Sequence, residues 1–355
     1  MLRMNQYVSK LVCVLVLTPL ALILAACGAN SHNTSKPVTR DLWSRIKASK
    51  QLVCGISGEL PGFSFVGTDG EYSGIDVDVC RAIAAGIFDN PNAVEYRTLN
   101  SKERFTALQT GEVDILSRNT SWTFGRATAQ GMDFAPVIFY DGQGLMVRKN
   151  SGIQSLQDLK DKAICVQTGT TTEQNLADQM RKRNIPYKSV VFEDVNVTFA
   201  TYSEGRCDAI TTDRSALVSR RSTLAKPDDH IILNDVLSSE PLAPAIAKGD
   251  TRWSDIVKWT VYTLIKAEEL GINSQNVAQL KNSSDPEIKR FLGVEGSLGV
   301  GLGLTNDFAF NIIKHVGNYG EIYERNLGKK SSFNLPRGQN QLWNENGLLY
   351  APPFR

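Results

Sequence analysis

The sequence contains one structural pattern twice, and this duplication limits the possible folds more than any other feature. Segments 51–58 (QLVCGISG) and 162–172 (KAICVQTGTTT) each predict a buried strand that holds one cysteine and runs into glycine and hydroxyl residues. Segments 104–120 and 198–213 each predict a short helix, a glycine stop, and a strand that holds an aspartate followed by apolar residues. Because strand, helix and strand follow in this order once in each half, the sequence predicts two similar α/β lobes.

Two extended segments predict the connections between these lobes. Residues 142–149 (GQGLMVRK) and 241–250 (PLAPAIAKGD) are apolar, rich in Gly or Pro, and show little helical periodicity. We expect them to be strands that cross between the lobes. Lobe 1 is then residues 40–148 together with 241–330, and lobe 2 is residues 149–240.

Helical periodicity returns after the second crossing strand. Patterns at 252–271, 285–293 and 306–326 predict helices; the first has a glycine stop and the second begins with a proline. Residues 331–355 are expected to form a C-terminal tail packed on the body. The 355 residues of the chain are enough for two lobes that each bury a core.

The first 26 residues predict an export signal. Arg3 and Lys10 form a basic start, and the apolar run that follows at 11–26 is short for a membrane-spanning helix. The rest of the sequence has no apolar run long enough to cross a bilayer. We therefore expect residues 1–26 to be a signal peptide.

The signal segment ends in LAAC, small residues that lead to Cys27. This pattern resembles the lipobox of bacterial lipoproteins, which implies cleavage before Cys27 and lipidation of its thiol. An ordinary signal peptide with an incidental cysteine is the alternative. Residues 27–39 are otherwise polar and predict a flexible tether between lipid and fold.

The charge balance of the mature chain excludes two classes of partner. The chain has 39 basic and 37 acidic residues, and loss of Arg3 and Lys10 with the signal would leave 37 of each. Nucleic acid and anionic lipid both require a basic surplus, so we expect neither as a partner. Contact with a membrane is expected only through the lipid anchor.

Four cysteines remain beyond the signal and Cys27, namely Cys54, Cys80, Cys165 and Cys207. In an oxidising compartment they predict two disulfides, with three connectivities possible. If each lobe has its own pair, the simplest pairing is Cys54 with Cys80 and Cys165 with Cys207. The cysteines and the scattered histidines do not have the spacing of a zinc site, and no phosphate-loop lysine is present, so no metal or cofactor is expected.

A resemblance to a known family rests on several motifs in a common order. The segment 72–87 (YSGIDVDVCRAIAAGI) resembles the signature of the extracellular solute-binding proteins of family 3, the receptors of polar amino-acid ABC transporters. PGFSF, ERFTALQTGEVD, the run that ends TFGR at residue 126, and VQTGTTTEQNL follow the order of that family. SRNTSWT, YDGQGLMVRK, RCDAITTD and LYAPPFR resemble its general L-amino-acid-binding branch. The resemblance covers residues 40–330, approximately.

The resemblance implies a fold and a function. The fold is a two-lobed periplasmic binding protein of type II, with two mixed sheets and flanking helices joined by two crossing strands. The function is that of a monomeric periplasmic receptor that captures an L-amino acid in a cleft by hinge closure and delivers it to the membrane permease of an ABC transporter. The alternatives are a ligand-sensing receptor or an enzyme on the same fold, such as a dehydratase or a murein-cleaving lyase.

An enzyme would need a titratable group with a tuned pKa at the cleft. His32 lies in the tether, and His230 and His315 lie outside the cleft motifs. The sequence therefore favours a receptor over an enzyme.

The resemblance implies ligand-binding residues in both lobes. In lobe 1, Arg126 matches the arginine that holds the ligand carboxylate by two parallel hydrogen bonds, Ser121 a donor to the same carboxylate, and Asn119 a position whose carbonyl accepts from the amino group. In lobe 2, Thr170 and Thr171 match further donors to the carboxylate, and Asp213 matches the acid that pairs with the ammonium group.

Several of these residues have structural alternatives. Asp213, Thr170 and Thr171 are also suitable helix caps. Asp76 and Asp78 are expected to cap and orient the helix that follows Gly74 rather than to act as an acid and base pair.

Three further positions bear on selectivity. Arg118 is expected either to form a surface ion pair or to reach the ligand side chain. Leu60 replaces an aromatic lid that is frequent in the family, and Ser57 stands where glutamate and aspartate binders often have an arginine. A broad specificity for polar amino acids is therefore expected.

Overall fold

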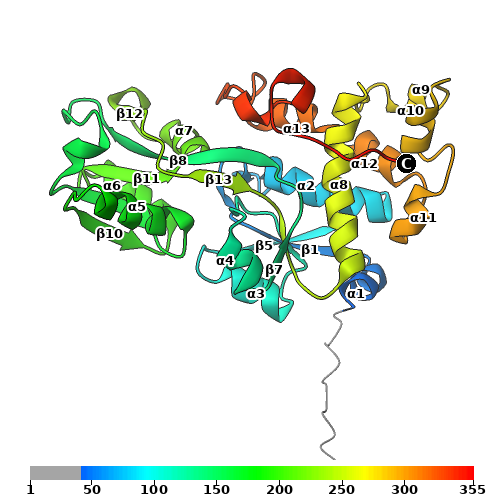
Figure 1. The fold of residues 1–355 in the computed structure, drawn as a ribbon, viewed down its shortest axis with the longest axis horizontal. Coiled ribbons are helices and arrows are strands. Elements are labelled where there is room, and N and C mark those ends of the chain that lie inside the picture. The colour runs from blue at the N-terminus through cyan, green and yellow to red at the C-terminus, as the bar shows by residue number, and fades with distance from the viewer. Residues whose placement is uncertain (1–40) are drawn as a thin grey trace, which may run out of the picture. The chain divides into compact units, whose positions relative to one another are not determined.

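The computed structural model of the chain describes residues 41–355. The predicted signal peptide, Cys27 and its tether lie outside the described residues. Within the described part, two main sheets carry helices, and this mixed α/β architecture confirms the predicted fold class (Figure 1). No described helix combines the length and apolar character that crossing a bilayer requires.

The first sheet contains strands from both ends of the described chain. In spatial order these strands are β5 (Val94–Thr98), β1 (Leu52–Ile56), β6 (Ile115–Leu116), β14 (Ala245–Ala247) and β7 (Met132–Phe134). β1 runs parallel to β5 and β6, whereas β14 is antiparallel to β6 and β7. The segment that returns at 241–250 therefore supplies the strand that joins β6 to β7.

Helices cover both faces of this sheet. Successive side chains of a strand point to opposite faces, and here both faces carry buried apolar side chains. Ile115 packs in the core that includes α2 (Ile75–Phe88), α8 (Thr251–Glu269) and α12 (Phe308–Val316). Its neighbour Leu116 packs in a separate core with the helix α3 (Arg104–Thr110).

The second sheet has the order β10 (Lys188–Phe192), β9 (Ala163–Gln167), β11 (Ala209–Asp213), β8 (Phe139–Arg148) and β12 (His230–Ile232). β9 runs parallel to β10 and β11, and β8 is antiparallel to β11 and β12. One face packs on α5 (Thr171–Lys182), and the other packs on α6 (Val195–Ser203) and α7 (Arg214–Arg221).

The strand β8 links the two sheets. Its first residues pair antiparallel with β13 (Ser239–Leu242), with Ser239 opposite Gly142 and Leu242 opposite Phe139. The rest of β8 belongs to the second sheet, and β14 follows β13 into the first. Figure 1 shows β8 and β13 running side by side between the two groups of elements.

The C-terminal segment is packed against the core of the first sheet and against β8. Leu342, Leu349 and Phe354 are buried in the core that contains α8. The Asn340 side chain accepts a hydrogen bond from the Tyr140 amide at 2.6 Å and donates one to the Tyr140 carbonyl at 3.1 Å. Asn340 thus takes the place of a neighbouring strand along this part of β8.

The remaining elements are short. They are the small antiparallel sheet of β2 (Glu59–Leu60), β3 (Ser64–Val66) and β4 (Tyr72–Ser73), and the helices α1 (Leu42–Ser49), α4 (Phe124–Thr128), α9 (Val277–Leu280), α10 (Pro286–Phe291) and α11 (Leu298–Leu302). Single 3₁₀ turns occur at Leu156–Leu159, Pro227–Asp229, Gly338–Asn340 and Trp343–Glu345.

The helical pattern at 306–326 forms two helices rather than one. α12 ends at Gly317, whose φ of 83° lies in the left-handed region that favours glycine. α13 (Tyr319–Asn326) begins at once, because Asn318 and Glu321 form a capping box. Helical periodicity continued through the break, so the sequence pattern alone did not separate the two helices.

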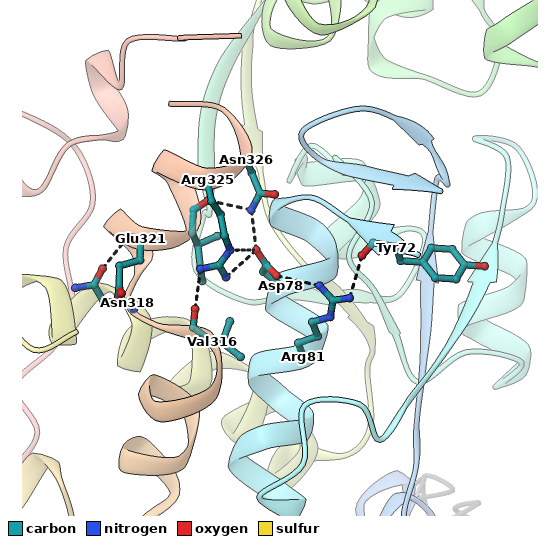
Figure 2. Close-up of polar contacts among 9 residues, drawn as sticks. Tyr72, Asp78, Arg81, Val316, Asn318, Glu321, Arg325 and Asn326 are labelled. Carbon is teal, nitrogen blue, oxygen red and sulfur yellow. Dashed lines mark hydrogen bonds and ion pairs between the residues drawn. The ribbon is translucent and has the colours of Figure 1, made fainter. Parts of the chain in front are cut away.

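Asp78 ties α13 to α2 and does not cap its own helix. The cap position is Gly74, and no side chain bonds there. The buried Asp78 carboxylate instead accepts from Arg325 at 2.9 Å and Asn326 at 2.7 Å, with Arg81 on its other oxygen, as Figure 2 shows. The expected cap was therefore wrong in detail, although Asp78 does orient the helix.

Two disulfides, Cys54–Cys80 and Cys165–Cys207, join the four cysteines in the predicted pairing. Cys54 lies on β1 and Cys80 on α2, so this bond ties the first sheet to a covering helix. Cys165 lies on β9, and Cys207 lies just before β11. Each bond therefore stays within the elements of one sheet.

Replacing both Cys165 and Cys207 with alanine is expected to lower the free energy of unfolding by about 2–4 kcal/mol, because the bond closes a loop of 42 residues in the unfolded chain. Urea unfolding of the variant and of the wild type, each with and without reductant, measures the loss. Reductant should lower the stability of the wild type further than that of the variant, which keeps only Cys54–Cys80. Equal stability of the oxidised proteins would contradict the prediction.

Candidate functional site

The candidate site is built on the loop that leaves β6. Asn119 has a φ of 32°, in the left-handed region that asparagine tolerates better than most residues. Its backbone amide donates to the buried Asp76 carboxylate at 3.0 Å, and the Ser117 hydroxyl donates to the same group at 3.4 Å. Asp76 therefore holds this turn in place.

Asp76 was expected to cap α2, and the structure gives it a different role. It lies on α2 but makes no cap bond, and its partners are on the site loop. Burial raises the pKa of Asp76 to about 6, while the Asn119 amide and the Arg118 guanidinium lower it. The Asp76 carboxyl thus holds the loop that contains Ser117 and Asn119 in position.

Arg126 lies in the first turns of α4, where Thr123 caps the helix. Its Nη1 donates to the Ser121 carbonyl at 2.8 Å, and its guanidinium lies 5.0 Å from the centre of the Phe105 ring. Burial lowers the pKa of Arg126, and the carboxylates of Glu240 and Asp213 oppose this shift. These contacts orient a buried cation with donors left for an anion.

Asp213 is the last residue of β11 and stands at the cap position of α7, but its side chain makes no cap bond. One carboxylate oxygen lies 3.4 Å from the Asn119 side-chain nitrogen, which donates to it. Only 5% of Asp213 is exposed. Burial and the neighbouring Asp141 and Glu240 raise the pKa of Asp213 well above its usual range.

The two threonines at the start of α5 differ in what they contact. Thr170 caps the helix by accepting from the Glu173 amide at 3.1 Å, and it also donates to the Gln167 carbonyl at 2.6 Å. Thr171 donates to Glu240 at 2.9 Å and lies 3.4 Å from the Ser121 hydroxyl. The structure thus brings Thr171, but not Thr170, into direct contact with the residues from the first sheet.

Two contacts join predicted residues near the first sheet to predicted residues of the second. Asn119 meets Asp213, and Ser121 meets Thr171, each at 3.4 Å. The buried Arg126 cation also lies close enough to the buried Asp213 carboxylate for their charges to act on each other. Such a pair of groups suits a small molecule that carries a negative group at one end and a positive group at the other.

Three charged residues of this region were missed by the sequence analysis. Arg104 is buried on α3 and donates to the Thr120 hydroxyl at 3.4 Å, and its Nε has no hydrogen-bond partner among residues 41–355. Asp141 on β8 and Glu240 on β13 are buried beside Asp213, and burial raises the pKa of Asp141 to about 6. A signal was available, because Asp141 and Glu240 are isolated acids in otherwise apolar, extended segments.

Arg118 does not form a surface ion pair. Only 4% of the residue is exposed, and its Nε donates to the Leu99 carbonyl at 2.7 Å. Arg118 lines a cavity of about 350 Å³ to which residues near both sheets contribute. None of the six predicted ligand-binding residues lines this cavity, so the cavity is distinct from the group of residues described above.

The fold and sequence match proteins of known classification. A sequence model of the bacterial extracellular solute-binding proteins, family 3, matches residues 52–275. The general L-amino acid-binding periplasmic protein AapJ of Rhizobium johnstonii is 54% identical over 88% of this chain and 92% of its own length. The glutamate/glutamine/aspartate/asparagine-binding protein BztA of Rhodobacter capsulatus is 46% identical over 94% and 97%.

A solved structure gives the same comparison in three dimensions. The periplasmic binding protein of an ABC transporter from Brucella ovis, solved with glutathione bound, superimposes with a TM-score of 0.86 at 50% identity. The superposition covers 89% of this chain and 99% of that protein.

Proposed function

This chain belongs to the bacterial extracellular solute-binding proteins of family 3, and from that premise we propose that it is the periplasmic receptor of an ABC transporter for polar or general L-amino acids. The relatives AapJ and BztA are named as amino-acid-binding proteins, which supports this ligand class. The lobes and their residues would then recognise the parts of the ligand that all amino acids share.

The observation that carries the proposal is the pair of opposite charges at the candidate site. Arg126 and Ser121 are suited to an α-carboxylate, since a guanidinium and a hydroxyl both donate. Asp213 is suited to an α-ammonium group, because an ionised carboxylate only accepts. The carbonyl of Asn119 and the hydroxyls of Thr170 and Thr171 would complete the shell.

Capture would proceed by closure of the hinge formed by β8 and β13. The ligand would first bind Arg126 and Ser121, and closure would then bring Asp213 and Thr171 onto it. In the structure, Asn119 contacts Asp213 and Ser121 contacts Thr171, so these groups from the two sheets face one another. A bound amino acid would replace these weak contacts with charged hydrogen bonds, and the membrane permease would bind the closed form.

The proposal extends to the cell envelope. Lipidation of Cys27 would anchor the receptor to a membrane, with residues 27–39 as the tether. The sequence pattern of residues 1–27 is the support for this part of the proposal.

A catalytic role is not favoured. The relatives are named as binding proteins, and the two described histidines are engaged away from the site. His230 bonds the Tyr202 hydroxyl at 2.7 Å, and His315 bonds Asp89 at 2.7 Å.

A thermal-shift screen against the twenty amino acids tests the function directly. A ligand that binds only the folded protein raises the melting temperature of that protein. At a ligand concentration of a hundred times Kd, it adds about 2.7 kcal/mol to the free energy of unfolding. We expect several polar L-amino acids to raise the Tm and to be recovered unchanged by mass spectrometry. No shift with any amino acid, or steady formation of a product, would contradict the proposal.

A further inference from the structure

The cavity that Arg118 lines contains none of the residues proposed to bind the shared part of an amino acid. Its volume is about 350 Å³, within the range of small-molecule sites. Elements of both sheets surround it, including Ser57, Glu59, Leu99, Arg118, Gln167 and Asp194. The charge of Arg118 acts on Arg126 and on Arg104, and Arg104 is also acted on by Asp213, so the cavity lies near the proposed amino-acid site.

Arg118 presents unused donors to this cavity. The hydrogen bond from its Nε to the Leu99 carbonyl sets the orientation of the guanidinium plane. In the described chain, residues 41–355, neither Nη1 nor Nη2 has a hydrogen-bond or ion-pair partner. A buried cation that faces a cavity with free donors favours a ligand oxygen there.

Glu59 presents unused acceptors to the same cavity. The described residues give its carboxylate no hydrogen bond and no ion pair, and the half-buried side chain carries a raised pKa, first because of burial and then because of Asp194. Arg220, which donates to the Glu59 carbonyl at 3.0 Å, is the cation that acts most strongly on Glu59, and Arg118 acts on it as well. Glu59 and Arg118 both line the cavity.

The other acidic side chains at the cavity are already engaged by the protein. Glu103 accepts from the Asn100 amide at 2.6 Å, Glu193 pairs with Lys102 at 2.6 Å, and Asp194 accepts from the Val197 amide at 2.8 Å. Arg118 and Glu59 are therefore the charged pair that remains for a ligand.

An amide is the chemical group that satisfies both partners at once. Its carbonyl oxygen accepts from a guanidinium, and its N–H donates to a carboxylate. A ligand carboxylate would satisfy Arg118 but would place a like charge near Glu59, and an apolar side chain would satisfy neither.

Building on the proposed function, we propose that this cavity receives the ligand side chain and that Arg118 and Glu59 together select a side-chain amide. Glutamine and asparagine carry this group as a primary amide, and a γ-glutamyl peptide carries it as a secondary amide. The cavity has room for on the order of ten water molecules at ~30 Å³ each. A single side-chain amide displaces only part of that volume, which leaves space for the extension of a γ-glutamyl peptide.

Calorimetry tests this inference with four ligands, namely L-glutamine, L-glutamate, γ-L-glutamylglycine and L-serine, whose short side chain carries neither an amide nor a carboxylate. The wild type is expected to bind glutamine more tightly than glutamate. Arg118→Ala should weaken the binding of glutamine and of the peptide at least about tenfold, because each of these ligands loses a charged hydrogen bond. The affinity for serine should change less than about threefold. Glu59→Gln should shift the preference toward glutamate.

The matched control is Glu193→Gln, because this carboxylate lies at the rim of the cavity and is paired with Lys102. It should leave the preference between glutamine and glutamate unchanged. Should Arg118→Ala fail to fold, Glu59→Gln alone still decides the question, because loss of the repelling charge must favour glutamate.

Three outcomes would overturn the inference. Arg118→Ala could weaken serine as much as glutamine, Glu59→Gln could leave the preference unchanged, or the wild type could bind glutamate and glutamine equally. In each of these outcomes serine still binds the wild type, so the proposed receptor function survives. A wild type that binds none of the four ligands would instead remove the receptor function, and this inference with it. Binding of glutamine without the γ-glutamyl peptide would overturn the secondary-amide part alone.

Discussion

Replacement of Arg126 with alanine is expected to weaken amino-acid binding by at least about thirtyfold. The guanidinium is buried, and its Nη1 is already held by the Ser121 carbonyl, so it meets a ligand carboxylate without reorganising. Loss of one partner from a buried charge pair costs about 2–5 kcal/mol, which is a weakening of roughly thirtyfold to several thousandfold. Isothermal titration calorimetry with the amino acid that gives the largest thermal shift measures this loss.

Two further variants separate recognition from folding. Arg126→Lys keeps the charge but not the fork of parallel donors, so it should recover only part of the affinity. Arg181→Ala removes an exposed arginine on α5 that pairs only with Asp178, and it should bind as the wild type does. An affinity within about threefold of the wild type in a folded Arg126→Ala protein would remove Arg126 from the site.

Asp213→Asn should weaken binding by about 2–5 kcal/mol and, in the absence of ligand, raise the melting temperature. The ammonium group would lose its counter-charge, whereas the empty protein would be relieved of a carboxylate buried near Asp141 and Glu240. A variant that merely unfolds would change both quantities in the same direction. Calorimetry and thermal unfolding of one preparation therefore distinguish the two explanations, and a lower Tm would contradict ours.

The same residue predicts the direction of the pH dependence. The ammonium group needs an ionised Asp213, so affinity should fall as the pH falls through the raised pKa of Asp213. The stability of the empty protein should change in the opposite sense. A carboxyl whose folded pKa is raised stabilises the protein fully below its unfolded pKa, and that stability is lost as the pH rises through the folded pKa. The affinity and the stability should both depend less on pH in Asp213→Asn. The pH dependence that remains should come from Asp141 and Asp76, whose pKa values are also raised.

The elements that the sequence predicted well are those whose signal is local. β1 and β9 each hold a cysteine in an apolar run, and the glycine stops after α3 and α6 lie where the pattern placed them. The disulfide pairing followed from the duplication of that pattern, because each half has two cysteines of its own.

The features that the sequence did not predict depend on contacts between distant segments. Glu240 belongs to the site because β13 pairs with β8, which places it beside Asp141 and next to the start of α5. Asp76 supports the loop around Asn119 although 43 residues separate them. Periodicity indicates which face of an element is buried, but it does not indicate which segment lies against that face.

The strand β8, which we propose as part of the hinge, is held by a residue far along the chain. Asn340 completes the hydrogen bonds of Tyr140 on β8, yet it lies well beyond residue 275, where the match to the family ends. A shortened protein that retained only residues 52–275 would lose Asn340 and leave the backbone amide and carbonyl of Tyr140 on β8 without these two hydrogen bonds. A fluorescent reporter built on this protein should therefore keep the segment that contains Asn340. The fluorescent protein can be fused after Arg355, which is exposed.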